Sequence, residues 1–420
     1  MSKHLRIWLF ALLATLLASN TLLAQGVITM TTSKAVGETI LLRVVANGNV
    51  SIEGALETGE MNEDGFKFYT IKSQTITIRG DVTELDCNEN QLTSLNVSKN
   101  TALTSLECSY NQLTSLDVSK NTALEELDCF SNQLTSLDVS KNTALEVLNC
   151  FSNQLTSLEV SKNTTLTKLW CSYNQLTSLD LSQNIALTKL DCSYDQLTSL
   201  DVSGCTALTE LNCINNQLTS LDVSKNTVLT ELECSYNQLT SLDLSQNTAL
   251  TELFCHSNQL TSLDVSKNTA LEVLDCLYNQ LTNLDVSKNT TLTSLECSYN
   301  QLTSLEVSKN TALEVLDCFS NQLTSLEVSK NTALTRLSCN DNKLTNLNMS
   351  GCDNLMVINC SNNYINGKAM TKLVNSLPNR RGMYCGTIFL VDSSSKKSDK
   401  NRCSAADVTT AKRKNWKVRQ

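Results

Sequence analysis

Residues 103–123 read LTSLECSYNQLTSLDVSKNTA, and variants of this 21-residue unit follow one another over residues 81–363. Apolar and polar residues alternate within the unit, so that Leu106 and Cys108 face one side of an extended segment while Glu107 faces the other. A unit of 21 residues leaves no room for a long helix. Each unit therefore predicts one coil of a solenoid, with a short strand, two corners, and short strands or 3₁₀ turns on the far side.

One cysteine marks the register of every unit, without an insertion or a deletion between units. This column consists of Cys87, Cys108, Cys129, Cys150, Cys171, Cys192, Cys213, Cys234, Cys255, Cys276, Cys297, Cys318, Cys339 and Cys360. A buried, reduced thiol packs as a small apolar side chain, and a straight column does not bring four thiolates into the tetrahedral arrangement that zinc needs. We therefore expect a structural ladder, with no metal site and no cofactor.

Asparagine recurs at both corners of the unit. The side-chain amide has donors and an acceptor, so stacked asparagines can satisfy backbone groups that no strand ladder reaches. The first corner column, which runs from Asn90 to Asn363, departs at Asp195, and the second departs at Cys205 and Cys352. We interpret these departures as local repacking and not as active sites.

The unit matches the leucine-rich-repeat pattern LxxLxLxxNxL, with cysteine in place of one leucine. It resembles the repeats of the internalin family, especially the internalin J branch, whose 21-residue repeats carry a cysteine ladder. It is also similar to repeat proteins that gut and oral bacteria export. The resemblance implies a leucine-rich-repeat solenoid of about fourteen coils with parallel strands on its concave face. It also implies a role in adhesion at a bacterial surface.

The segment before the coils has two parts. Residues 1–24 have a basic start, an apolar core and small residues before Ala24, which is typical of a secretory signal peptide; an uncleaved signal anchor is the alternative. Residues 25–80 alternate apolar and polar side chains, as in residues 39–45 and 69–72, and predict a β-rich N-terminal cap. We expect a secreted or cell-surface protein that is not inserted in a membrane after signal cleavage.

Residues 364–420 break the period and predict a C-terminal cap with both helix and strand. Residues 368–377 have helical apolar spacing that Pro378 ends, and residues 386–391 read as a strand. Cys385 and Cys403 both lie in this segment. Because export leads to an oxidising space, we expect a disulfide between them.

The charge of the chain is unevenly distributed. The formal net charge is −9, yet residues 361–420 hold thirteen Lys and Arg against three Asp, so the preceding coils are strongly acidic. An acidic body repels nucleic acid, whose binding needs cations. The basic tail is interpreted as a solvated, charged cap.

The sequence contains few residues that could support catalysis. His256 is the only histidine in residues 25–420, and no sequence neighbour supplies the partner that general acid–base work needs. Carboxylates such as Asp117, Asp138, Asp180 and Asp201 recur once per coil beside lysines, which is typical of a solvated face. Weak calcium binding there is an alternative that no glycine-rich calcium motif supports. We predict that the protein is not an enzyme.

The outward side of the strands is the candidate binding surface. Carboxylates occupy the position just before most cysteines, as at Asp86, Glu107, Asp128, Asp191, Glu233, Asp275, Glu296 and Asp317. The candidate ligand-binding residues are Tyr110, Phe130, Phe151, Trp170, Tyr173, Tyr194, Tyr236, Phe254, His256, Tyr278, Tyr299 and Phe319. Aromatic side chains are frequent anchors of protein interfaces. The alternative is that these rings cover the strand ends and stack on one another.

Three functions are compatible with these patterns. The first is a non-catalytic protein-binding or adhesion module for a host or neighbouring cell surface. The second is a glycan-binding surface protein, because aromatic rings with flanking carboxylates also hold sugars. The third is a structural scaffold without a specific ligand, which near-identical repeats favour. Trp170, Phe254 and His256 depart most clearly from the repeat consensus, so a specific binder should depend on them.

Overall fold

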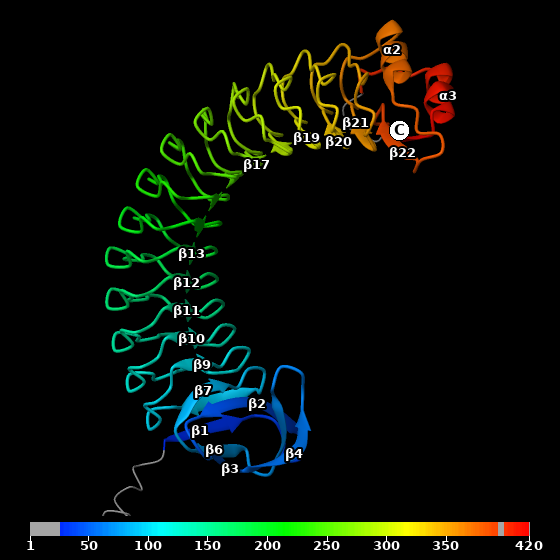
Figure 1. Ribbon diagram of the computed structural model, residues 1–420. Coiled ribbons are helices and arrows are strands. Elements are labelled where there is room, and N and C mark those ends of the chain that lie inside the picture. The colour runs from blue at the N-terminus through cyan, green and yellow to red at the C-terminus, as the bar shows by residue number, and fades with distance from the viewer. Residues whose placement is uncertain (1–25, 394–398, 420) are drawn as a thin grey trace, which may run out of the picture. The chain divides into compact units, whose positions relative to one another are not determined.

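The computed structural model describes residues 26–393 and 399–419. The predicted signal peptide, residues 1–24, lies outside these residues. The chain falls into two compact units, Met1–Leu166 and Thr167–Gln420. In each unit, one short parallel strand recurs every 21 residues (Figure 1).

The first unit begins with a β-rich cap that pairs with both sides of the first coil. Its first sheet has the order β3 (Ser51–Glu53), β6 (Thr75–Arg79), β1 (Val27–Thr32) and β8 (Leu92–Asn96). A second antiparallel set pairs β4 (Ala55–Met61), β5 (Lys67–Ile71), β2 (Thr39–Ala46) and β7 (Val82–Asp86) in that order. Since β7 and β8 belong to the first coil, the cap covers edges that would otherwise be open to pairing with another chain.

The coils contribute three-residue strands that pair in parallel without a shift in register. In the first unit they are β9 (Ser105–Glu107), β10 (Glu126–Asp128) and β11 (Val147–Asn149). In the second unit they are β12 (Lys168–Trp170), β13 (Lys189–Asp191), β14 (Glu210–Asn212), β15 (Glu231–Glu233), β16 (Glu252–Phe254), β17 (Val273–Asp275), β18 (Ser294–Glu296), β19 (Val315–Asp317), β20 (Arg336–Ser338) and β21 (Val357–Asn359). The central leucine of each strand is buried, as Leu106 and Leu127 are. The predicted alternation of inward and outward residues is therefore confirmed.

The far side of each coil consists of tight turns, as the unit length predicts. The backbone N–H of Asn121 donates to the carbonyl of Val118, and the N–H of Leu124 donates to the carbonyl of Asn121. Both bonds span three residues, which is 3₁₀ geometry. Between these turns the coils bond to one another, as where Gln133 N–H donates to the Leu113 carbonyl.

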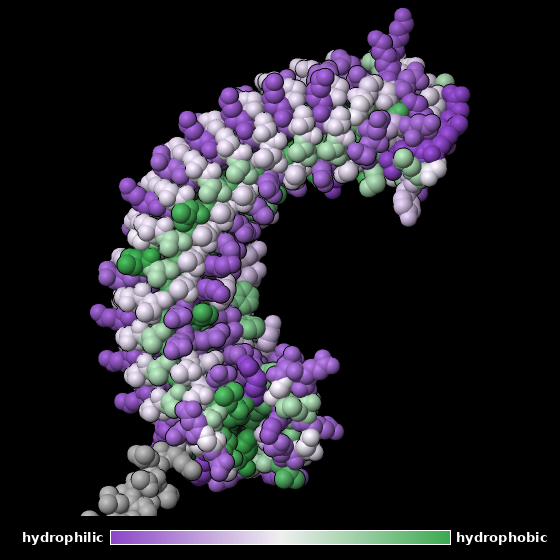
Figure 2. Space-filling view, viewed as in Figure 1, coloured by the Kyte–Doolittle hydropathy of each residue, from purple (hydrophilic) through white to green (hydrophobic). Residues whose placement is uncertain are grey.

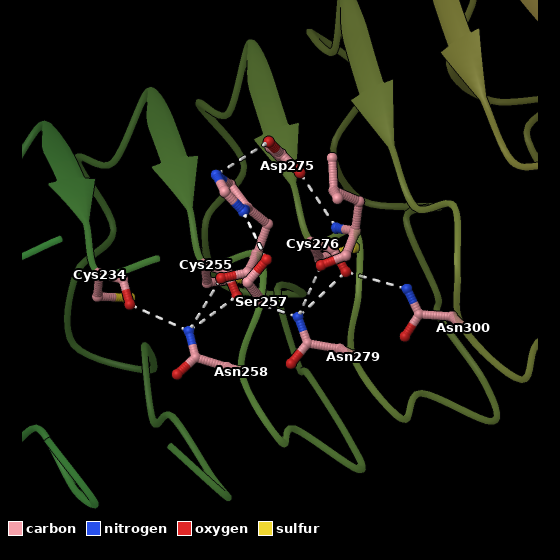
Figure 3. Close-up of polar contacts among 10 residues, drawn as sticks. Cys234, Cys255, Ser257, Asn258, Asp275, Cys276, Asn279 and Asn300 are labelled. Carbon is pink, nitrogen blue, oxygen red and sulfur yellow. Dashed lines mark hydrogen bonds and ion pairs between the residues drawn. The ribbon is translucent and has the colours of Figure 1, made fainter. Parts of the chain in front are cut away.

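The first asparagine column closes the corner after each strand. The Asn258 amide Nδ2 donates to the carbonyls of Cys234 (3.0 Å) and Cys255 (3.1 Å) (Figure 3). Its Oδ1 accepts from the N–H of Leu239 (3.0 Å). One amide thus joins its own coil to the preceding one. Asn279 repeats the arrangement one coil later. The expected role of these asparagines is confirmed by this bonding.

Where another residue replaces an asparagine of the two columns, the backbone keeps its path, but the side chain forms fewer hydrogen bonds. Asp195 Oδ1 accepts from the N–H of Leu176 (2.8 Å), but its Oδ2 is buried without a hydrogen-bond partner. In the second column the Cys205 thiol lies 3.8 Å from the carbonyl of Leu181, and the Cys352 thiol donates to Val328 (3.1 Å). All three side chains are buried in the coil.

The cysteine ladder lies inside the coils. All fourteen ladder cysteines are fully buried. Burial raises the pKa of the Cys234 thiol to about 12 and that of Cys129 well above its ordinary value. Such thiols stay protonated and pack as apolar side chains.

The second unit ends in a cap of two helices and two strands. These are α2 (Lys368–Ser376), β22 (Gly386–Phe389), α3 (Ala405–Arg413) and β23 (Trp416–Arg419). Strand β22 pairs with β21, and β23 pairs with β22, so the cap extends the sheet of the last coil (Figure 1). The helix predicted over residues 368–377 and the following strand are present. The bulky Trp416 side chain is almost fully buried under β22.

The expected bond between Cys385 and Cys403 is not formed in the structure, where both are free thiols. Each thiol turns toward a carbonyl next to it in the chain. The Cys385 sulfur lies 3.4 Å from the Gly386 oxygen, and the Cys403 sulfur lies 3.7 Å from the Ser404 oxygen.

Candidate functional site

The strand face of the second unit is formed by the outward residues of β12 to β20. Each strand buries its central leucine and turns the two residues beside it to the other side, where most of them are half-buried. The first row is Lys168, Lys189, Glu210, Glu231, Glu252, Val273, Ser294, Val315 and Arg336. The second row is Trp170, Asp191, Asn212, Glu233, Phe254, Asp275, Glu296, Asp317 and Ser338. Because the strands are in register, consecutive members of a row are neighbours about 4.8 Å apart.

Three consecutive strands place like charges side by side in the first row. Glu231 pairs in register with Glu210 on one side and with Glu252 on the other. Lys189 forms an ion pair with Glu210, with 2.6 Å between Nζ and Oε1. Among the described residues, no ion pair reaches Glu231 or Glu252. Like charges directly opposite each other destabilise a sheet, so this row is not explained by stability.

Glu233 of the second row lies on the same strand as Glu231. Burial, more than any other cause, raises the pKa of both carboxyl groups. The charges of Glu252 and Glu210 raise the pKa of Glu231 further, and the charge of Glu231 raises that of Glu233 further. Each side chain is half-buried. The two acids therefore form a partly desolvated pair that a cation would stabilise.

Trp170 lines a hollow at one end of this acidic region. The hollow has a volume of about 160 Å³, and its polar walls are the side chains of Lys189, Asp191, Glu210, Asn212 and Glu231. The indole is half-buried, so one part of the ring stays accessible. An aromatic ring beside carboxylates can hold a cationic or a hydroxylated group.

Phe254 lies at the other end of the acidic region, and more carboxylates follow it. Burial raises the pKa of Asp275 to about 6 and also raises that of Glu296. The guanidinium of Arg336 pairs with Asp317 at 2.9 Å. On the nine strands of this face, eight carboxylates face three cations.

The twelve candidate residues occupy three different places. Trp170 and Phe254 lie in the strands. The second group follows the cysteine directly and is half-buried: Phe130, Phe151, His256 and Phe319. The third group is exposed in the turn one residue further on: Tyr110, Tyr173, Tyr194, Tyr236, Tyr278 and Tyr299. The strand positions and the turn positions are thus distinct places within a coil.

The six turn tyrosines have positive φ angles, from 50° at Tyr299 to 54° at Tyr173. This left-handed conformation is costly for a residue with a large side chain. Other coils adopt the same conformation with serine, as at Ser131 (φ 51°), or with asparagine, as at Asn215 (φ 52°), and asparagine adopts it more readily. Strained residues that stay exposed are often functional.

The aromatic rings contact one another along the turn edge. Tyr278 and Tyr299 are stacked with centroids 4.1 Å apart, and Phe319 meets Tyr299 edge-on at 5.0 Å. In the first unit, Phe130 contacts Tyr110 at 4.5 Å. The alternative considered from sequence, that the rings stack on each other, is therefore realised. The tyrosine side chains nevertheless stay exposed.

His256 has partners that its sequence neighbours do not indicate. Its Nε2 lies 4.0 Å from Asp275 Oδ2 of the next coil, and its Nδ1 lies 3.2 Å from Ser257 Oγ (Figure 3). The ring also meets Tyr236 edge-on. Burial lowers the pKa of the imidazole, so it is mostly neutral at pH 7. The 21-residue period could have revealed Asp275 as a neighbour, because it lies nearly one period later.

The first unit holds a smaller acidic cluster against the cap. Arg43 of β2 reaches across to Glu107 of β9, with 3.0 Å between Nη2 and Oε1. Burial and the nearby Asp86 raise the pKa of Glu107 to about 7. The cap therefore supplies an ion-pair partner to Glu107, whereas no ion pair among the described residues reaches Glu231 or Glu233.

Sequence reasoning missed the first row of the strand face. It identified the carboxylates just before the cysteines but not Glu210, Glu231 and Glu252, which lie two residues earlier. The alternation that turns Glu107 outward also turns Ser105 outward. This signal was sufficient to find the row.

The far-side carboxylates differ from those of the strand face. Asp180 and Asp222 are exposed, and hydrogen bonds from the serine two residues later lower their pKa.

Within the described residues, no group of three His, Cys, Asp or Glu is arranged to hold a metal ion. No helix of the described residues is both long and apolar enough to cross a membrane. Figure 2 shows hydrophilic side chains recurring coil by coil along the surface in view.

Known proteins share this fold and its repeats. The family model of leucine-rich repeats in two copies matches residues 122–163. No curated protein matches the chain by sequence. The functional domain of InlJ from Listeria monocytogenes, which includes a cysteine ladder, is similar to this chain at 38% identity. That similarity covers 76% of this chain and 77% of the solved InlJ domain, with a TM-score of 0.64.

Two further solved structures are similar at lower identity. The internalin InlF from Listeria monocytogenes is 25% identical over 67% of this chain and 82% of its own, with a TM-score of 0.53. The leucine-rich effector protein YopM from Yersinia pestis is 25% identical over 67% of this chain and 78% of its own, with a TM-score of 0.56.

Proposed function

Because the chain belongs to the internalin-type leucine-rich-repeat family with 21-residue cysteine-ladder repeats, we propose that it is an exported, non-catalytic protein-binding or adhesion module. Its strand face in the second unit is the binding surface, and the partner is a protein at a host or neighbouring cell surface. Export rests on the composition of residues 1–24 alone.

One observation carries this proposal. The strand face combines the hollow beside Trp170 with carboxylates at Glu231 and Glu233 that have no ion-pair partner among the described residues. A scaffold without a ligand gains nothing from such an arrangement, since like-charged neighbours cost stability. A binding surface does gain, because a partner can neutralise the carboxylates and cover the ring.

A glycan is the second candidate ligand. The exposed turn tyrosines, such as the stacked pair Tyr278 and Tyr299, favour it, because sugar rings pack against aromatic faces. Protease treatment and periodate oxidation of the extract distinguish a protein partner from a glycan partner.

Capture from host cell-surface and mucus extracts tests the proposal. The bait is residues 25–420, and each extract is used untreated, protease-treated and periodate-oxidised. A variant with W170S, Y173S, Y236S and F254S serves as the matched bait. We expect capture that is lost after protease treatment and with the variant. Loss on oxidation alone would favour the glycan. Equal capture by the variant would show that the strand face is not the binding surface.

A further inference from the structure

We propose that the protein partner presents an extended, arginine-bearing basic segment, which binds against Trp170 and pairs with the carboxylates of Glu231 and Glu233. This inference rests on the proposed function and adds the chemistry of the partner to it. It follows from charge complementarity, ring placement and the spacing of the strands.

Charge selects the class of the partner segment. The carboxylates between Trp170 and Phe254 are Asp191, Glu210, Glu231, Glu233 and Glu252. Against them the same strands offer Lys168 and Lys189, of which Lys189 is engaged by Glu210. A cationic segment would relieve this repulsion, whereas an anionic or a neutral apolar one would leave the carboxylates desolvated and unpaired.

The rings favour arginine over lysine. A guanidinium stacks on an aromatic face and donates to carboxylates in a planar fork, whereas an ammonium is a compact and more strongly hydrated charge. Trp170 shares its hollow with Asp191 and Glu231. A single guanidinium in this hollow could therefore stack on the indole and donate to a carboxylate at once.

Spacing sets the length of the segment. Phe254 lies four strands beyond Trp170, which corresponds to about 19 Å at the usual strand separation. An extended chain covers this distance in about six residues. The segment thus crosses β12 to β16 and places alternate side chains on the strand face.

The intrinsic fluorescence of the protein reports on this site. Residues 25–420 contain two tryptophans, Trp170 and Trp416. Trp416 is 1% exposed, whereas Trp170 is half-buried beside the hollow. A ligand in the hollow therefore changes the emission of Trp170 and leaves that of Trp416 as a constant background.

The test is a fluorescence titration of residues 25–420 at about 150 mM salt, where exposed charges are screened beyond about 8 Å. The probe is the synthetic hexapeptide Gly-Arg-Gly-Arg-Gly-Arg. We expect saturable binding that changes the Trp170 emission, at least threefold weaker binding of the lysine version, and no binding of the glutamate version. The W170F variant should lose the change in emission.

Two variants with the same change in net charge separate the site from general electrostatics. E231Q/E233Q should weaken binding of the arginine peptide at least tenfold, whereas D180N/D222N on the far side should change it less than twofold. Equal losses in both variants would overturn the inference, as would unchanged Trp170 emission at saturating peptide. Thermal unfolding of each variant shows whether it is folded.

Failure of this inference is distinguishable from failure of the proposed function. If an extract protein is captured through the strand face but the arginine peptide neither binds nor competes with it, the proposed function stands and the basic segment is wrong. If nothing is captured, the proposed function fails whatever the peptide does. Capture that the arginine peptide displaces supports both.

Discussion

A few single residues differ from the consensus of the repeat. Asp195 occupies a corner position at which the next coil carries Asn216. The Asn216 amide donates to the carbonyls of Cys192 (2.9 Å) and Cys213 (3.2 Å), whereas a carboxylate has no donor to offer. Asp195 Oδ2 is instead buried without a partner, and burial raises the pKa of Asp195 to about 7.

Replacing Asp195 with asparagine should therefore stabilise the protein. We expect D195N to raise the free energy of unfolding by about 1–3 kcal/mol at pH 8, because it restores hydrogen bonds to buried carbonyls. Urea unfolding measures this change. The control D201N, which alters an exposed far-side aspartate, should change the free energy by less than about 0.5 kcal/mol.

The gain from D195N should also depend on pH. The folded-state pKa of about 7 lies above the ordinary aspartate value of 3.8, so the folded protein holds a proton that the unfolded chain has lost. The contribution of Asp195 to stability is thus present below about pH 4 and lost as the pH rises through 7. The difference between D195N and the wild type should be small at pH 4 and largest at pH 8. A difference that is constant over this range would contradict the assigned pKa.

For single residues, the sequence predicts the side-chain directions that recur in every repeat. It does not predict unusual backbone conformations or contacts between side chains of neighbouring coils. It places Leu106 and Cys108 inside correctly, because alternation alone decides the direction of a strand residue. It does not indicate that Tyr194 adopts a positive φ (54°), since no local signal places a tyrosine in that conformation. The contact of His256 with Asp275 also escapes a reading of sequence neighbours.

Elements are held in register by the exact length of the unit, because each strand must bury its leucine beside the leucine of the next coil. Deleting residues 303–323 removes one full period and should leave a folded chain whose unfolding is still cooperative. Deleting residues 303–322 shifts all later residues by one and turns their apolar side chains outward. We expect this second deletion to lower the melting temperature much further. Circular dichroism of both deletions measures the difference, and equal melting temperatures would contradict the register.

The C-terminal cap depends on a close approach between two of its strands. A Cβ atom built at Gly386 of β22 would lie 2.6 Å from Cε3 of Trp416, so the indole fits only against a glycine. G386A should therefore destabilise the protein by about 1–3 kcal/mol and shift the emission of Trp416 toward that of an exposed ring. The neighbouring T387A, at a half-buried position, should shift neither quantity. Unchanged emission in G386A would show that the cap adapts.

The sequence predicts these caps only in part. The apolar spacing of residues 368–377 was sufficient to place α2, and Pro378 to end it. The second helix, α3, has a weaker apolar pattern, and its start depends on Ser404 and Asp407, which cap each other. Strand β23 is short, and its pairing with β22 depends on the fold of the whole cap.

In the whole molecule, the inward and the outward residues of the repeat have different roles. The inward residues are almost the same in every coil and make the solenoid. The outward residues vary, and the acidic strands between Trp170 and Phe254 are where this variation gathers charge and aromatic rings. Specific recognition requires such variation, because identical coils would offer a partner many equivalent registers.

The measurement that tests this central claim most directly is site-specific photocrosslinking to the captured partner. A photoreactive phenylalanine analogue is placed at Asn212, in the middle of the strand face, or at Thr219, which is exposed on another side of the same coil. Both are neutral positions, and neither lies in the core. The account predicts a crosslinked partner from position 212 and none from position 219. Crosslinking from position 219 alone would place the partner away from the strand face and contradict the account.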